Sequence, residues 1–93
     1  MHIELRLFAS LRKLLPPGSP RGHCALELPE GTTLGDMLTQ MRIARASAQM
    51  VLINGEHDRN FRRPLHDGDV VSVFPPVAGG LGYMGLAVKG LWG

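Results

Sequence analysis

The sequence predicts a small α+β domain in which a mixed sheet of four to five strands carries one main helix on one face. Apolar residues alternate along residues 1–8 and again along 69–74, which is the pattern of half-buried strands. Between them, apolar residues recur at helical spacing over 33–41. A chain of 93 residues accommodates one compact domain and leaves little room for a buried catalytic cleft. A binding or carrier role is therefore favoured over an enzyme.

The first half of the chain is expected to begin with a hairpin. Residues 1–8 form its first strand, and 9–15 make a short helical turn before a loop rich in Pro, Gly and Ser. A second strand follows over 23–28. The two strands are thus joined by a long connection.

The clearest helix is expected from Thr33 to Met41. Thr33 is a suitable N-cap and Asp36 lies in the first turn, where a negative charge is favourable. The apolar residues at positions i, i+3, i+4 and i+7 are Leu34, Met37, Leu38 and Met41. This face should pack on the sheet.

The second half is expected to supply the remaining strands. Residues 50–53 form a short buried strand that ends at Asn54-Gly55, a dipeptide suited to the positive φ values of a tight hairpin turn. Residues 61–65 are irregular, and the last strand, 69–74, follows a turn at 67–68. The predicted core comprises Ile3, Leu5, Leu7, Cys24, Leu26, Leu38, Met41, Leu52, Val71 and Val73.

Composition excludes several classes of function. The net charge is +2 with scattered basic residues, so no nucleic-acid partner is expected. The single cysteine cannot form an intramolecular disulfide, which fits the cytoplasm. The apolar segment 77–93 is shorter than the ~20 residues of a membrane span and contains six glycines. It is therefore not expected to be a membrane anchor.

No metal site or bound cofactor is expected. His23 and Cys24 are adjacent on a strand and point to opposite faces, and the other histidines show no ligand spacing. Cys24 shares the apolar face of its strand and is interpreted as a small core residue. The aspartates are explained by caps, turns and solvated edges, and no carboxylate pair suggests acid–base catalysis.

A family resemblance is carried by four stretches in order. They are IELRLFASLR at 3–12, PEGTTL at 29–34, INGE at 53–56, and LHDGDVV with the following FPPVAGG between 65 and 80. Together they resemble the sulfur-carrier family (MoaD/ThiS family), whose members include the small subunit of molybdopterin synthase. The resemblance implies a ubiquitin-like β-grasp domain over 1–80 followed by an apolar, Gly-rich tail over 81–93.

The resemblance also implies a chemistry in which the chain has no active site of its own. A ubiquitin-activating-type enzyme would use ATP to adenylate a C-terminal carboxylate at Gly80, and sulfur would then replace AMP to give a thiocarboxylate. Gly79 and Gly80 lack a Cβ, so they form the thinnest backbone for a narrow channel. Pro75-Pro76 would hold the root of this terminus extended. The sulfur would pass to the large subunit of molybdopterin synthase or to another acceptor.

Phe74 is the first candidate for partner binding. Alternation places it on the sheet face away from the helix, where it is either a partly covered edge aromatic or an apolar contact for a partner. Val70, Phe8 and the stem of Arg6 would join it if the first and last strands are parallel neighbours, as in ubiquitin-like folds. Phe74 to Pro76 would then link this docking surface to the reactive terminus.

The tail departs from the family pattern, because carriers end at Gly-Gly. Some relatives carry an extension that a zinc-dependent peptidase removes, so a processing peptidase is one implied partner. The alternatives are a β-grasp interaction module that carries no sulfur and a ubiquitin-like protein modifier. Glycines argue against a helix in the tail, and an extended or irregular segment is expected, ordered where Leu86 or Trp92 contacts an apolar surface.

Overall fold

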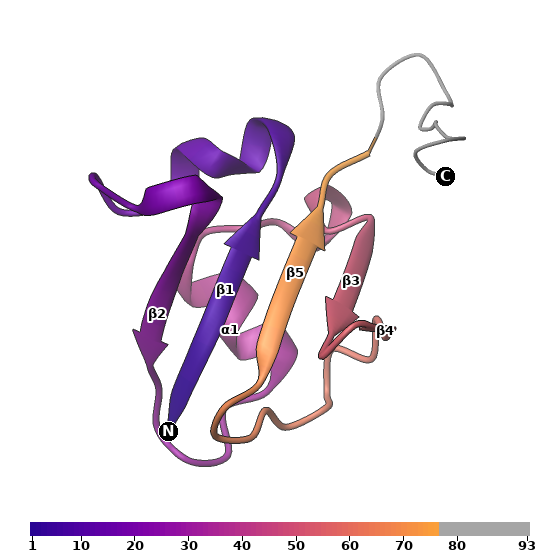
Figure 1. The fold of residues 1–93 in the computed structure, drawn as a ribbon. Coiled ribbons are helices and arrows are strands. Elements are labelled where there is room, and N and C mark those ends of the chain that lie inside the picture. The colour runs from indigo at the N-terminus through magenta and orange to yellow at the C-terminus, as the bar shows by residue number, and fades with distance from the viewer. Residues whose placement is uncertain (77–93) are drawn as a thin grey trace.

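The computed structural model describes residues 1–76 and shows a mixed five-stranded sheet with one α-helix on one face (Figure 1). The strand order is β2-β1-β5-β3-β4. The strands are β1 His2–Leu7, β2 His23–Glu27, β3 Met50–Ile53, β4 Glu56–His57 and β5 Val70–Phe74. The helix is α1 Leu34–Gln40, and three 3-10 helices are η1 Ala9–Leu14, η2 Pro20–Gly22 and η3 Arg45–Ser47. The predicted α+β class and element order are confirmed.

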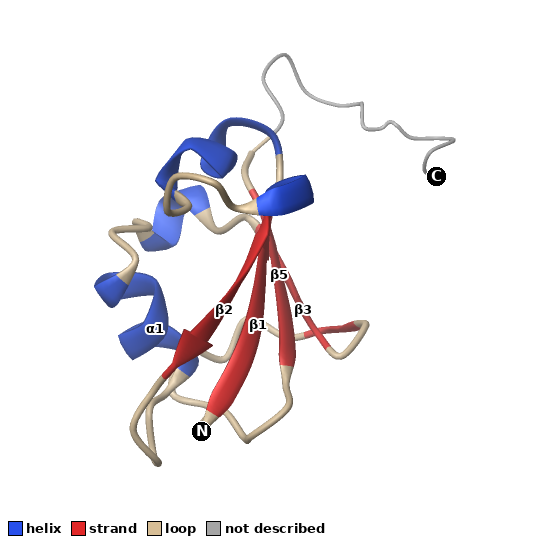
Figure 2. Cartoon of the chain, turned by 60° about the vertical axis from the view of Figure 1, so that its left-hand side comes forward, coloured by secondary structure: helices blue, strands red, loops and turns tan. Residues whose placement is uncertain are grey.

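The centre of the sheet is the parallel pair β1 and β5, which joins the first strand to the last. In this pair Leu5 lies beside Val71 and Leu7 beside Val73. Strand β2 pairs with β1 in antiparallel direction, and β3 does so with β5. Helix α1 lies on one side of the sheet (Figure 2), so the side chains that alternate along each strand divide into a helix-facing set and an outer set.

Helix α1 follows the predicted N-cap Thr33, and the structure adds that this cap is reciprocal. The backbone N–H of Asp36 donates to Thr33 Oγ1 at 3.1 Å, and the backbone N–H of Thr33 donates to Asp36 Oδ2 at 3.2 Å. These bonds satisfy two of the amide donors that a helix start leaves unpaired. The cap fixes where the helix begins, so that Leu34, Met37 and Leu38 are buried against the sheet.

The predicted Asn54-Gly55 turn is present and also braces the neighbouring strand. Asn54 and Gly55 have φ values of 54° and 85°. The Asn54 side-chain amide donates to Asp69 Oδ1 at 2.9 Å, while its oxygen accepts from the Val70 N–H at 2.9 Å. Asp69 is only 6% exposed, so this pairing satisfies a buried carboxylate at the start of β5.

The core matches the prediction with one error, at Leu52. The buried apolar residues are Ile3, Leu5, Leu7, Leu11, Leu28, Leu34, Met37, Leu38, Ile43, Ala48, Val51, Ile53, Leu65, Val71 and Val73. Val51 and Ile53 pair with Val73 and Val71 and point to the helix, so Leu52 points outward. Residues 50–53 are all apolar, so the sequence does not show which two of these side chains are buried.

Three other predicted core residues lie at its border. Cys24 and Leu26 are partly buried because β2 is an edge strand, and Met41 is partly buried because it caps the end of α1. All three still pack against the buried cluster. None of the helices within residues 1–76 is both long enough and apolar enough to cross a membrane.

The two faces of β3 can be distinguished by paired substitutions. Ile53→Ala is expected to destabilise the domain by about 2–5 kcal/mol, because it leaves a cavity in the core. Leu52→Ala removes a half-buried outer side chain and is expected to cost about 1 kcal/mol. Urea unfolding of both variants measures the difference. Equal losses would contradict the observed orientation of β3.

Candidate partner-docking surface at the end of the sheet

Two phenylalanines stack on the outer face of the sheet at the carboxyl ends of β1 and β5. The ring centroids of Phe8 and Phe74 are 4.2 Å apart and the rings are inclined by 11°. Phe8 follows Leu7, which pairs with Val73, so the parallel register brings the two rings side by side. The Phe8 N–H donates to the Val73 carbonyl at 3.2 Å and extends the contact by one residue. The predicted association of Phe8 with Phe74 is present.

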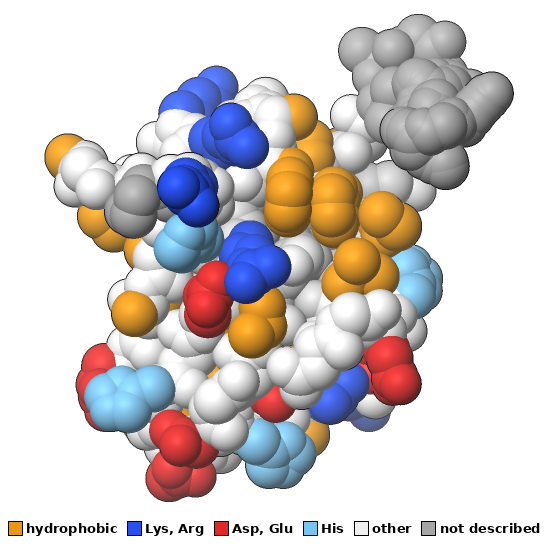
Figure 3. All heavy atoms as spheres, in the orientation of Figure 1, with side chains coloured by type: hydrophobic (Ala, Val, Ile, Leu, Met, Phe, Trp, Pro, Cys, Tyr) orange, Lys and Arg blue, Asp and Glu red, His pale blue; other side chains and the backbone are white. Residues whose placement is uncertain are grey.

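Strand β3 adds two apolar side chains that the sequence interpretation missed. Met50 pairs with Phe74 in register and is 38% exposed, and the half-buried Leu52 points to the same outer face. We call Phe8, Met50, Leu52 and Phe74 the aromatic patch. In Figure 3 hydrophobic side chains gather over the upper ends of β1, β5 and β3. Which side chains of 50–53 face outward follows only from the pairing of β3 with β5.

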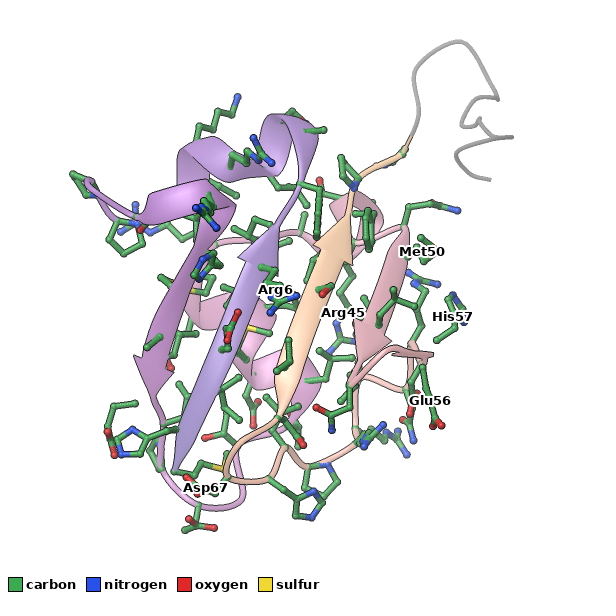
Figure 4. The ribbon with its side chains drawn as sticks, in the orientation of Figure 1. Arg6, Arg45, Met50, Glu56, His57 and Asp67 are labelled. Atoms are coloured by element: carbon green, nitrogen blue, oxygen red, sulfur yellow. The ribbon has the colours of Figure 1, made fainter. Side chains whose placement is uncertain are left out.

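Arg6 and Val70, also predicted to join Phe74, lie on the same outer face but farther from the end of β5. Arg6 Nε donates to Glu4 Oε2 at 2.7 Å, and Figure 4 shows Arg6 in front of β1 and β5, apart from Met50 beside β3. Val70 pairs with Glu4 and is separated from Phe74 by Ser72 on the same face. The outer face is therefore divided into an apolar end and a charged middle. This division predicts a partner surface with an apolar centre and a polar rim.

The chain leaves the sheet at the aromatic patch. The Phe74 carbonyl accepts from the Gln49 N–H at 2.9 Å, which ties the last strand residue to the segment before β3. Pro75 is half-buried and Pro76 is exposed. Neither proline can donate a backbone hydrogen bond to a strand, so the pairing of β5 ends here. Gly79 and Gly80, the predicted attachment residues, lie outside the described residues.

Titratable groups with shifted pKa values lie elsewhere. Burial raises the pKa of the Cys24 thiol, which keeps it protonated and lowers its reactivity. The pKa of Asp58 is lowered by a hydrogen bond from the Asn60 N–H and another from the Arg63 guanidinium. Within residues 1–76, no group of three or more His, Cys, Asp or Glu side chains is arranged to hold a metal ion. The candidate site in the described part is the aromatic patch.

Comparison with protein families identifies the chain. The model of the ThiS family matches residues 5–80, which is most of the sequence. The chain belongs to the ThiS family. The match ends on the second glycine of the Gly79-Gly80 pair. Among curated proteins, no sequence matches this chain.

Solved structures support the same assignment and fold. The Haloferax volcanii HVO 2177 protein is 31% identical with a TM-score of 0.65, covering 86% of this chain and 87% of that one. SAMP1 from Haloferax volcanii is 26% identical with a TM-score of 0.63, covering 86% of this chain and all (100%) of that one. A Pyrococcus furiosus protein described as molybdopterin converting factor, subunit 1, is 27% identical with a TM-score of 0.61, covering 82% and 98%. The ubiquitin-like β-grasp fold is thereby confirmed for this ThiS-family chain.

The stacked pair gives a prediction about stability. Phe8→Ala and Phe74→Ala should each destabilise the domain, and the double variant should lose less than the sum of the two. The expected coupling is about 0.5–1.5 kcal/mol, the usual contribution of an aromatic pair beyond area burial. A double-mutant cycle in urea measures it. Additive losses would show that the two rings contribute independently.

Proposed function

We propose that this ThiS-family chain is a sulfur carrier whose working form ends at Gly80. The observation that carries the proposal is the extent of the family match, which runs from residue 5 to residue 80 and stops at Gly80. The pair Gly79-Gly80 follows β5 and Pro75-Pro76 after only two further residues, Val77 and Ala78. The last strand is followed by two conformationally restricted prolines and then by two glycines without a Cβ. This order suits a carrier that presents its terminal carboxylate to another protein.

The proposed reaction takes place in a ubiquitin-activating-type partner enzyme. A carboxylate oxygen of Gly80 attacks the α-phosphorus of ATP, forming an acyl-adenylate and releasing pyrophosphate. A sulfur nucleophile supplied by the partner system then attacks the acyl carbon and AMP leaves. The nucleophile is the terminal sulfur of a cysteine persulfide, so the product is an acyl disulfide. A second thiol of the partner system attacks the cysteine sulfur of this S–S bond, which gives the thiocarboxylate and a disulfide between the two thiols. The chain contributes the acyl group and a docking surface, whereas the partner binds ATP.

The spacing between the aromatic patch and Gly80 allows docking and reaction to occur at separate sites of the partner. Gly80 is six residues beyond Phe74 in the sequence. Six extended residues span at most about 20 Å, at ~3.3–3.6 Å per residue. A partner can therefore bind the aromatic patch on its surface while Gly80 reaches a catalytic site inside it. Shortening this connection would separate docking from reaction.

The acceptor we favour is the large subunit of molybdopterin synthase. The supporting observation is the 27% identity to the Pyrococcus furiosus protein described as molybdopterin converting factor, subunit 1. A second candidate function is a ubiquitin-like modifier, favoured by the likeness to the protein described as small archaeal modifier protein 1. Both begin with activation of Gly80. They differ in the product, which is a thiocarboxylate for the carrier and an amide to a lysine for the modifier.

The proposal requires removal of residues 81–93, because in the full chain the Gly80 carbonyl is part of a peptide bond. A processing peptidase would hydrolyse the bond between Gly80 and Leu81. Without such cleavage, the chain would act instead as an interaction module that carries no sulfur. The two forms can therefore be compared directly.

Adenylation tests the proposal. With a cognate activating enzyme and ATP, the chain ending at Gly80 is expected to release pyrophosphate and gain the mass of AMP. The full chain should do neither. A chain ending at Gly79 is the matched control and should react poorly, because its carboxylate falls one residue short of the catalytic site. Adduct formation by the full chain would refute the need for processing, and an unreactive Gly80 form would favour the interaction module.

Docking can be tested separately on the chain ending at Gly80. Met50→Asp places a charge at the exposed edge of the aromatic patch and is expected to weaken binding to the activating enzyme by about fivefold or more, equivalent to ~1 kcal/mol. Thr39→Asp, on the exposed side of α1, is the control and should bind normally. Phe74→Ala should also weaken binding, with part of its effect arising from the lost stack. Calorimetric titration measures all three, and unchanged affinity for Met50→Asp would exclude the patch from the interface.

A further inference from the structure

Strand β2 forms an open edge of the sheet, at the side opposite to β4 (Figure 1). Among the described residues, β2 has a neighbouring strand on one side alone, which is β1. The edge at β4 is short, because β4 comprises only Glu56–His57, whereas β2 runs from His23 to Glu27. An unpaired edge presents backbone donors and acceptors to which another strand can bond. The edge at β2 is therefore the place where this sheet can be extended.

The pairing with β1 determines which backbone groups of β2 lie on the open side. The Leu28 N–H donates to the Met1 carbonyl at 2.9 Å, and the Met1 amino group donates to the Leu28 carbonyl at 2.7 Å. Because backbone groups alternate in direction along an antiparallel strand, Leu26 and Cys24 also bond to β1. The residues between and beside them direct their backbone groups away from the sheet.

The outward-directed groups include the N–H and C=O of Ala25 and of Glu27 and the C=O of His23. Within residues 1–76, no loop or helix bonds to the backbone of Ala25 or Glu27. Ala25 and Glu27 are also exposed, so their surroundings leave room for a further strand. The middle of β2 thus offers donors and acceptors in alternation along one edge.

The side chains of β2 form a self-complementary series. On the outer face the order is His23, Ala25 and Glu27, and on the helix side Cys24 and Leu26 are partly buried. A two-fold axis through Ala25 places His23 opposite Glu27 of a second copy and Cys24 opposite Leu26 of that copy. Each contact then occurs twice, as in any symmetric dimer interface. An imidazole N–H meets a carboxylate on one face, and two apolar side chains meet on the other.

The same axis also matches the backbone groups. Ala25 exchanges both N–H···O bonds with Ala25 of the second copy, and the Glu27 N–H donates to the His23 carbonyl of that copy. A shift of one residue would place these groups opposite Cys24 or Leu26, whose backbone groups already bond to β1. Side chains and backbone therefore select one antiparallel register.

We propose that two copies of this chain associate edge to edge through β2, in antiparallel direction about a two-fold axis at Ala25. The two sheets become one continuous sheet. The contact goes beyond the carrier function proposed above, and it leaves Phe74 accessible because β1 separates β2 from β5. A single short strand gives a small interface, so the dimer is weak and depends on protein concentration.

Sedimentation velocity of the full chain measures this association. The chain is expected to shift from monomer to dimer between about 10 μM and 1 mM, the range of weak interfaces. Ala25→Pro removes the N–H donor at the two-fold axis and should weaken association about tenfold or more. This N–H points away from β1, a position at which an edge strand tolerates proline. Ala25→Ser retains the donor and is the matched control. Circular dichroism verifies that both variants are folded.

A charge exchange tests the register without changing the backbone. Glu27→Lys alone places Lys beside His23 of the second copy, and His23→Glu alone places two glutamates together, so each should weaken the dimer. The double variant His23→Glu/Glu27→Lys should restore it. The two positions lie about 13 Å apart within one chain, at ~3.3 Å per residue, so they cannot compensate each other there. Glu56→Lys makes the same charge change at the opposite edge and should leave association unchanged.

Hydrogen exchange followed by NMR gives a residue-level readout. The amides of Ala25 and Glu27 should become protected as the concentration rises, whereas those of Cys24 and Leu26 should be protected throughout. A chain that stays monomeric at about 1 mM, the upper limit for a weak dimer, would overturn the proposal. Association that ignores Ala25→Pro, or that Glu56→Lys weakens, would place the contact on another surface. Failure of the double variant to recover would exclude the proposed register.

Discussion

The parallel pairing of β1 with β5 is the constraint on which the rest of the structure depends. It places Leu5 and Leu7 beside Val71 and Val73 on the helix side. The same register places Phe8 against Phe74 on the outer side. Because side chains alternate with a period of two, a shift of one residue would move the core residues outward and the phenylalanines inward. The core and the aromatic patch therefore depend on the same strand register.

Polar contacts at the other end of the two strands hold this register. The His2 N–H donates to Asp67 Oδ1 at 2.7 Å, and the Gly68 N–H donates to the His2 carbonyl at 2.7 Å. Asn54 bonds to Asp69 and Val70 from the β3 side. The turn before β5 is thus attached to both neighbouring strands before its apolar residues begin. Hydrogen bonds specify the position of β5, and the buried apolar side chains supply most of the stabilisation.

The proposed function depends on one feature of the chain, its exit from the sheet at Phe74. A carrier of this type needs an exposed apolar surface near a thin, extended terminus, and such a surface is also a site for unwanted association.

Most of the secondary-structure elements could be predicted from the sequence alone. Periodicity predicted the strands and the helix, Thr33 and Asp36 predicted the cap, and Asn54-Gly55 predicted the turn, because each depends on interactions among neighbours in sequence. The sequence could not predict that Leu52 and Met50 face outward. Residues 50–53 are all apolar, so only the pairing of β3 with β5 shows which side chains face the helix. The Phe8–Phe74 stack likewise depended on the register of strands that are far apart in sequence. Local chemistry determines the elements, whereas contacts between distant segments decide which face of each strand becomes core and which stays on the surface.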